Sequence, residues 1–112
     1  MQYAVSKCTI VIWDVAYDLF PRVSLEIQKA GGNPIMIRCD VSKSEEVDKA
    51  MKQTLEEVDK IDILINNAGV VCGKPFFDMN EEEIRKTSDI NCFGGLWVLK
   101  AVYATGKLRH VT

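Results

Sequence analysis

Two asparagines, an alanine and a glycine stand together at residues 66–69, directly after the apolar run 61–65. A short apolar, β-branched run that ends in a polar turn is typical of a buried parallel strand. In open α/β sheets, ligands bind beyond the carboxyl ends of the strands. A side-chain amide both donates and accepts hydrogen bonds, and a glycine lets a flat ligand approach the backbone. We therefore regard Asn67, Ala68 and Gly69 as candidate ligand-binding residues.

Three further polar residues occupy positions that suggest a site. Asp14 follows the apolar run C-T-I-V-I-W, Asp40 follows P-I-M-I-R-C, and Asn91 lies inside a predicted helix. Asparagine is uncommon in a helix interior, and Gly94 and Gly95 should each weaken the helix by ~1 kcal/mol relative to alanine. We therefore expect either close packing here or a bent helix whose carbonyls serve another purpose.

Strands and helices are predicted to alternate along the chain. Apolar runs predict strands at 8–13, 34–39 and 61–65, and residues 108–112 resemble the start of another. Amphipathic helices are predicted between them, which favours parallel strands joined by crossovers and an α/β fold.

Each predicted helix has its own start or stop signal. The first covers 21–30, with a proline in its first turn, and the second follows the S-x-x-E capping box at 42–45. The third is opened by Asn80 and Glu83 and ended by Gly106. Its expected buried stripe consists of Ile84, Thr87, Asn91, Val98 and Ala101.

The composition limits the possible partners and location. The chain has 112 residues, 47% of them hydrophobic, and a formal net charge of −2 without a basic block. Nothing here favours nucleic-acid or membrane-surface binding, and no apolar run has the length of a membrane span. Because the N-terminus also lacks a signal-peptide layout, we expect an intracellular, cytoplasmic location. Association with the endoplasmic reticulum or lipid droplets is expected only if an anchor lies outside this chain.

The cysteines predict no metal site. Cys8, Cys39, Cys72 and Cys92 are widely spaced, and the chain has a single histidine, His110. A zinc site needs clustered Cys and His ligands. We interpret the four cysteines as small apolar side chains in a reducing compartment.

The segment D-I-L-I-N-N-A-G closely resembles the signature of the short-chain dehydrogenase/reductases. Within that family, V-I-W-D-V and N-N-A-G-V-V-C-G-K-P-F are similar to the retinol and 17β-hydroxysteroid dehydrogenase branch. The resemblance implies a partial Rossmann-type, doubly wound parallel sheet forming a single partial dinucleotide-binding domain over 1–112. It also implies an NAD(P)-dependent oxidoreductase that moves hydride between nicotinamide and an alcohol or carbonyl substrate, such as a retinoid, a steroid or another lipid.

The resemblance also implies a role for each cofactor-binding residue. Asp14 would hydrogen-bond the adenosine ribose, and its carboxylate would repel a 2′-phosphate, so NAD is favoured over NADP. Asp40 and Val41 would edge the adenine ring, while residues 67–69 would line the ribose. The alternative for both aspartates is that they are ordinary turn residues.

Asn91 resembles the asparagine of the family's Asn-Ser-Tyr-Lys tetrad, where the asparagine bends its helix and its backbone carbonyl holds a water of the proton relay. The alternative is a core amide with satisfied hydrogen bonds. Other parts of the family pattern are missing. We expect the glycine-rich pyrophosphate loop to precede residue 1, and no serine occurs beyond Ser88.

Two Y-x-x-x-K pairs resemble the catalytic Tyr-Lys pair only in spacing. Tyr3 and Lys7 stand directly before the first predicted strand, without room for the long helix that carries the family's pair. Tyr103 and Lys107 enclose the glycine that should end the third helix. Because neither pair fits, we expect this chain alone to be catalytically inactive.

Two other functions stay open. A non-catalytic shortened isoform could associate with a full-length relative, because family members commonly dimerise through the Asn91 helix. The apolar surface for this would be Phe93, Leu96, Trp97 and Val98. A small flavodoxin-like binding module also fits the alternation of strands and helices, although the chain has no phosphate-binding loop.

Overall fold

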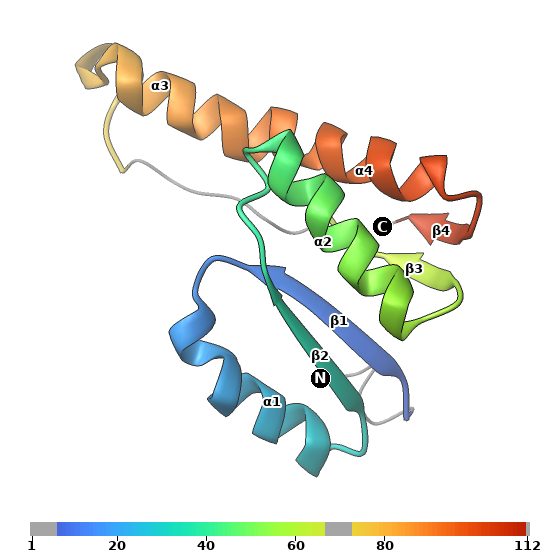
Figure 1. The fold of residues 1–112 in the computed structure, drawn as a ribbon. Coiled ribbons are helices and arrows are strands. Elements are labelled where there is room, and N and C mark those ends of the chain that lie inside the picture. Colours follow the sequence, from blue (N-terminus) through green and yellow to red (C-terminus); the bar gives the residue numbers. More distant parts are fainter. Residues whose placement is uncertain (1–6, 67–72, 112) are drawn as a thin grey trace. The chain divides into compact units, whose positions relative to one another are not determined.

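The computed structural model describes residues 7–66 and 73–111, which form two compact units, one up to Asp40 and one from Val41 (Figure 1). We call them unit 1 and unit 2. Unit 1 contains β1 (Thr9–Asp14), the 3₁₀ turn η1 (Tyr17–Leu19), α1 (Phe20–Lys29) and β2 (Asn33–Arg38). Unit 2 contains α2 (Ser44–Glu57), β3 (Ile61–Leu64), η2 (Phe76–Asp78), α3 (Glu81–Ser88), the π-helical η3 (Asp89–Gly94), α4 (Gly95–Ala104) and β4 (Leu108–Val111).

Unit 1 is a β-α-β motif with a small core. β1 and β2 are parallel, in a register that runs from Thr9 opposite Asn33 to Asp14 opposite Arg38. α1 packs on β2, and its Ile27 is 1% exposed. Both strands and the helix confirm the predicted elements, and the strand bounds differ from the prediction by one residue.

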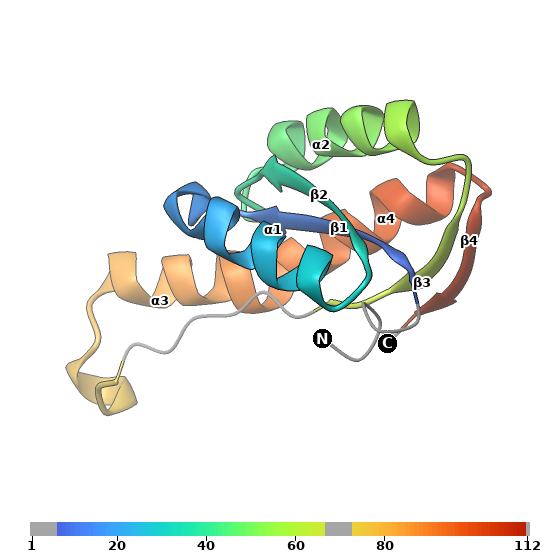
Figure 2. The same cartoon turned by 90° about the horizontal axis from the view of Figure 1, so that it is seen from below.

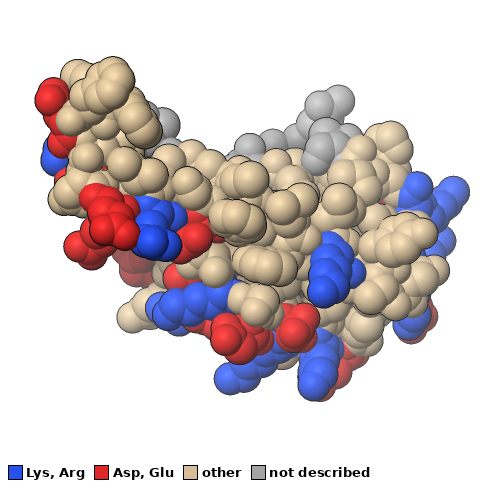
Figure 3. Space-filling model, turned by 90° about the horizontal axis from the view of Figure 1, so that it is seen from above, with Lys and Arg blue, Asp and Glu red and all other residues tan. Residues whose placement is uncertain are grey.

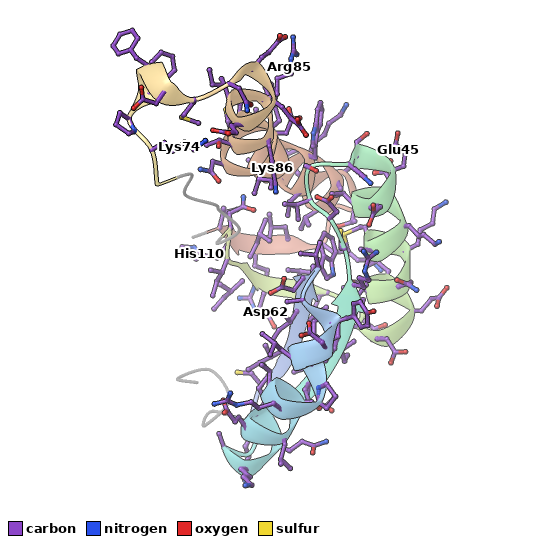
Figure 4. All side chains as sticks on the ribbon, turned by 90° about the vertical axis from the view of Figure 1, so that its left-hand side faces the viewer. Glu45, Asp62, Lys74, Arg85, Lys86 and His110 are labelled. Carbon is purple, nitrogen blue, oxygen red and sulfur yellow. The ribbon has the colours of Figure 1, made fainter. Side chains whose placement is uncertain are left out.

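Unit 2 is built on the contact between α2 and α4, which lie side by side (Figures 1 and 2). β3 and β4 pair in parallel, so the predicted fourth strand is confirmed. Asp62 and His110, labelled in Figure 4, lie on these two strands. Among the described helices, none is long and apolar enough to cross a membrane. The buried side chains at the helix contact are Val47, Ala50, Met51 and Thr54 of α2 and Val98 and Val102 of α4.

The capping signals give one confirmed prediction and one wrong one. Asn80 caps α3, and its side chain accepts a hydrogen bond from the Glu83 N–H at 2.8 Å. The capping box predicted at 42–45 places the helix start one residue too early, because α2 begins at Ser44. The N-cap residue is therefore Lys43, whose side chain makes no capping hydrogen bond. Ser42 lies one residue too early for that role.

β3 is a strand, as predicted, but it is not buried. Asp62 and Ile63 are exposed, and only the ends Ile61 and Leu64 are half-buried. A strand is buried on both faces when helices cover both sides and strands pair with both edges. Among the described strands only β4 pairs with β3, so the backbone of β3 pairs with a described strand along one edge only.

The third predicted helix is interrupted by a π-helical segment. Residues 89–94 form η3, which continues α3 into α4. Asn91 lies within η3 and is exposed, so the prediction that it belongs to the buried stripe is wrong. A π-helical turn holds more residues than an α-helical turn. The extra residue changes the direction in which Asn91 points relative to Val98, which is buried on α4.

Gly94 is buried because the helix passes very close to Val41. A Cβ atom added at Gly94 would lie 2.8 Å from Val41 Cγ2 and 3.3 Å from the Val41 carbonyl oxygen. The φ angle of Gly94 is −56°, so space rather than backbone conformation calls for glycine here. Gly95 is different, since its added Cβ would come no closer than 3.8 Å, to Asn66 Nδ2. The close packing expected of this glycine pair therefore belongs to Gly94.

Gly94→Ala and Gly95→Ala should have opposite effects on stability. Overpacking against Val41 costs ~1–3 kcal/mol, while alanine gains ~1 kcal/mol of helix propensity at either site. We expect the free energy of unfolding, measured in urea, to fall by up to about 2 kcal/mol for Gly94→Ala. For Gly95→Ala it should stay level or rise by up to about 1 kcal/mol. Equal stability of the two variants would contradict the close contact.

Candidate functional site

Asp14 presents its carboxylate at the carboxyl end of β1. The residue is exposed, and its Oδ1 accepts a hydrogen bond from the Ala16 N–H at 3.1 Å. Its backbone carbonyl accepts one from the Cys39 N–H at 3.0 Å, which ties the end of β1 to the chain leaving β2. The turn thus fixes one carboxylate oxygen, and the other is available to accept hydrogen bonds from a pair of hydroxyl groups.

The neighbouring strand ends in an arginine. Arg38 is the register partner of Asp14 at the end of β2, and its guanidinium carbon lies 5.8 Å from the centre of the Tyr17 ring. That ring belongs to η1, directly after the Asp14 turn. Unit 1 therefore holds an acidic and a basic side chain at the carboxyl ends of two adjacent parallel strands.

In unit 2, the junction of η3 and α4 contacts two residues that each follow a strand in the sequence. Val41, which comes after β2 in sequence, packs against Gly94, and Asn66, after β3, donates a hydrogen bond from Nδ2 to the Gly95 carbonyl oxygen at 3.3 Å. The Gly95 carbonyl oxygen of the helix thus accepts a hydrogen bond from outside the helix, as expected for a helix weakened by two glycines. Asn66 was not predicted as a site residue. The sequence feature that could have identified Asn66 is a side-chain amide directly after a strand, together with two glycines in a later helix that allow a close approach.

A groove of about 670 Å³, lined by polar and charged residues, borders the π-helical segment. It extends from Ser42, next to Val41, along α3 to Asp89, and its other lining residues are Asn80, Glu81, Glu82, Arg85 and Lys86. Figure 4 shows Arg85 and Lys86 on this helix and Lys74 near its start. Lys74 Nζ lies 2.7 Å from Glu83 Oε1. The groove is lined by both acidic and basic side chains, so it does not favour a ligand of one charge. Residues of both charges also occur on the face seen in Figure 3.

The predicted site residues fall into three groups. Asp14 and Asp40 belong to unit 1, while Val41 and Asn91 belong to unit 2. Asn67, Ala68 and Gly69 lie outside the described residues. Within unit 2, the structure brings Val41 against Gly94, three residues after Asn91.

Neither Tyr-Lys pair forms a helical catalytic pair in the described part of the chain. α4 ends at Ala104, and Gly106 has a φ of +68°, so Lys107 does not continue the helix that carries Tyr103. Tyr103 is 76% exposed. Tyr3 of the other pair lies outside the described residues. Residues 7–66 and 73–111 also contain no group of three or more His, Cys, Asp or Glu side chains that could hold a metal ion.

Relatives with known functions are similar to most of this chain. Epidermal retinol dehydrogenase 2 of Mus musculus is 34% identical over 102 residues, which cover 90% of this chain and 33% of the relative. The 17-beta-hydroxysteroid dehydrogenase 13 of Rattus norvegicus is 30% identical over 101 residues, covering 90% and 34%. The predicted similarity to the retinol and steroid dehydrogenase branch is confirmed. This chain spans about a third of the length of these curated relatives.

Solved structures confirm the Rossmann-type α/β fold. An NAD⁺-bound xylitol dehydrogenase matches with a TM-score of 0.88 and 25% identity, covering 96% of this chain and 43% of that one. An alcohol dehydrogenase from the archaeon Thermococcus sibiricus, complexed with 5-hydroxy-NADP, matches with a TM-score of 0.85 and 26% identity, covering 91% and 44%. Solved neighbours thus include complexes with both kinds of nicotinamide cofactor.

The family model described as short chain dehydrogenase matches residues 1–109, nearly the whole chain. This match agrees with the alternating helices and parallel strands. The chain therefore belongs to the short-chain dehydrogenase/reductase family of oxidoreductases.

Proposed function

We propose that this chain forms the adenosine-binding part of an NAD-dependent oxidoreductase, within a single partial dinucleotide-binding domain. The observation that carries the proposal is the exposed Asp14 carboxylate, fixed by the Ala16 N–H at the carboxyl end of a parallel strand. One oxygen is held by the backbone, so the other can accept hydrogen bonds from the ribose hydroxyls. A negative charge there disfavours a 2′-phosphate, which supports NAD over NADP.

We assign the binding of the adenine ring and the support of the proton relay mainly to residues of unit 2. Val41 is held in place by Gly94, so a flat ring can rest against a rigid aliphatic side chain beside Asp40. Asn67, Ala68 and Gly69 are proposed from the sequence alone to line the ribose. Asn91 lies where π-helical hydrogen bonding replaces the regular pattern, which supports a role for its backbone carbonyl in holding water.

The bound nicotinamide would accept or give up hydride, with an alcohol or carbonyl compound as the other reactant. The similarity to retinol and 17-beta-hydroxysteroid dehydrogenases supports a retinoid, a steroid or another lipid as that substrate. The family match over residues 1–109 favours this function over a flavodoxin-like module. Among the described cysteines, Cys8, Cys39 and Cys92 form no disulfide bond, which supports a reducing, intracellular location.

Replacing the carboxylate should weaken adenosine binding selectively. We expect Asp14→Ala to lower the affinity of the chain for ADP-ribose by about tenfold, because a hydrogen bond to a charged group is lost. The affinity would be measured by amide chemical-shift titration. Asp18→Ala removes an exposed carboxylate from the neighbouring turn η1 and should change the affinity less than about twofold. Equal losses in both variants would contradict a specific role for Asp14.

The purified 112-residue chain should show no turnover. Tyr103 and Lys107 do not share a helix, and no serine follows Ser88, so the groups that would move the proton and orient the substrate are missing. The test is NADH formation from NAD with retinol and a panel of secondary alcohols. The purified mouse relative, assayed in parallel, provides the positive control. A measurable rate from the chain alone would contradict the assignment.

A second candidate function is association with a full-length relative through α4. Phe93 and Trp97 stack with ring centres 6.3 Å apart, and Leu96 is 53% exposed. An apolar groove of about 460 Å³ lies along the helix, lined by Leu96, Trp97, Leu99, Lys100 and Tyr103. Val98 was expected on this surface but is 6% exposed and belongs to the core. Figure 3 shows a broad stretch of uncharged side chains between the charged ones.

Placing a charge in this apolar groove should weaken the association. We expect Leu96→Glu to reduce co-purification with a full-length retinol dehydrogenase relative by about tenfold, because a buried carboxylate would lack a partner. Gln53→Glu introduces the same group on the exposed face of α2 and should leave co-purification unchanged. If the unmodified chain fails to co-purify, or if both variants bind equally well, the second function is excluded.

A further inference from the structure

The junction between η3 and α4 is where the long helix changes from π-helical to α-helical hydrogen bonding. The Gly95 N–H donates to the Cys92 carbonyl oxygen, three residues earlier in the chain. A regular α-helix would direct this N–H to the carbonyl oxygen of Asn91, four residues earlier. The hydrogen-bond register at Gly95 therefore decides what surrounds the Asn91 carbonyl group, which the proposed function assigns to the proton relay.

Packing of α3 does little to hold this irregular register. π-Helical turns are rare and occur mostly as single turns inside α-helices, so a specific contact is needed to keep one in place. None of the eight described residues of α3 is buried, so α3 can rotate about its axis at little cost. By contrast, α4 is fixed, because Val98 and Val102 are buried against α2. The contact that holds the register therefore lies at the junction itself.

Two described contacts occur at this junction, and both come from segments that follow a strand. Val41 packs against Gly94, and Asn66 Nδ2 donates to the Gly95 carbonyl oxygen at 3.3 Å. Apolar packing has no preferred direction, whereas a hydrogen bond weakens steeply when its donor and acceptor are misaligned. The Asn66 hydrogen bond is therefore the contact that can fix the direction of the Gly95 carbonyl group.

We propose that Asn66 is a positioning residue, which holds the π-helical register of η3 and with it the direction of the Asn91 backbone carbonyl. This inference rests on the proposed function, in which that carbonyl holds a water of the proton relay. Asn66 acts through the Gly95 peptide group rather than on the reactants. Without its Nδ2 donor, η3 relaxes toward α-helical hydrogen bonding, in which the Gly95 N–H bonds to the Asn91 carbonyl oxygen and competes with the water.

The experiment follows this register by NMR in the full chain, through the scalar coupling that a hydrogen bond transmits between a backbone nitrogen and a carbonyl carbon. In the unmodified chain, the Gly95 nitrogen should show no coupling to the Asn91 carbonyl carbon. Asn66→Asp keeps the shape of the side chain but removes the N–H donor, so this coupling should appear. Asn66→Gln keeps a donor on a longer side chain and should keep the coupling absent.

A matched control makes the same substitution elsewhere on the surface. Asn33 is exposed at the start of β2, in unit 1, so Asn33→Asp should leave the coupling absent. Because Asn66 is itself exposed, its variants should remain folded. Circular dichroism and urea midpoints verify that each variant keeps the fold of the unmodified chain.

The outcomes separate this inference from the function beneath it. A coupling between Gly95 and Asn91 that appears in Asn66→Asp alone supports the positioning role. A coupling already present in the unmodified chain, absent from Asn66→Asp, or equal in both Asn66 variants overturns that role, whether or not the chain binds ADP-ribose. If Asn66→Asp gains the coupling but the unmodified chain does not bind ADP-ribose, Asn66 holds the helix register and the proposed function is wrong.

Discussion

The close approach of the long helix to Val41 is the constraint on which unit 2 depends. Only a hydrogen atom fits between Gly94 and this side chain, since a Cβ would lie 2.8 Å from Val41 Cγ2. One residue later, the Gly95 carbonyl accepts a hydrogen bond from Asn66. The segments that follow β2 and β3 are thus held against the same turn of helix. The cost is a helix interior with two glycines, which α4 offsets by burying Val98 and Val102 against α2.

The elements governed by local chemistry could be predicted from the sequence. The N-cap at Asn80 needs only an acceptor side chain before a free backbone N–H, and the stop at Gly106 needs only a residue that tolerates a φ of +68°. The strands at the Asp14 and Asn66 positions follow from apolar runs that end in polar residues. Each of these signals spans only a few residues, so it can be recognised without knowing which residues far away in the sequence it contacts.

Most of the wrong or missing predictions concern features that depend on groups far apart in the sequence. A prediction from periodicity assumes about 3.6 residues per turn throughout the helix, and it therefore placed Asn91 on the buried stripe. The π-helical segment has more residues per turn, so Asn91 faces another direction than the α-helical repeat predicts. The exposure of Ile63 in β3 depends on which strands pair with its edges, and the role of Asn66 depends on a carbonyl 29 residues away. The N-cap predicted at Ser42 is wrong for a local reason, because the helix starts one residue later than the motif suggested.

The charge balance at Asp14 shows why one residue is not enough to assign cofactor preference. A carboxylate at the end of a strand indicates ribose binding, but its effect on a 2′-phosphate depends on the net charge within a few ångströms. The parallel register places Arg38 opposite Asp14, although the two residues are 24 positions apart in the chain. A sequence motif that ends at Asp14 does not include that neighbour. Parallel pairing brings the end of the adjacent strand beside Asp14, so a motif that stops at one strand end describes only part of its surroundings.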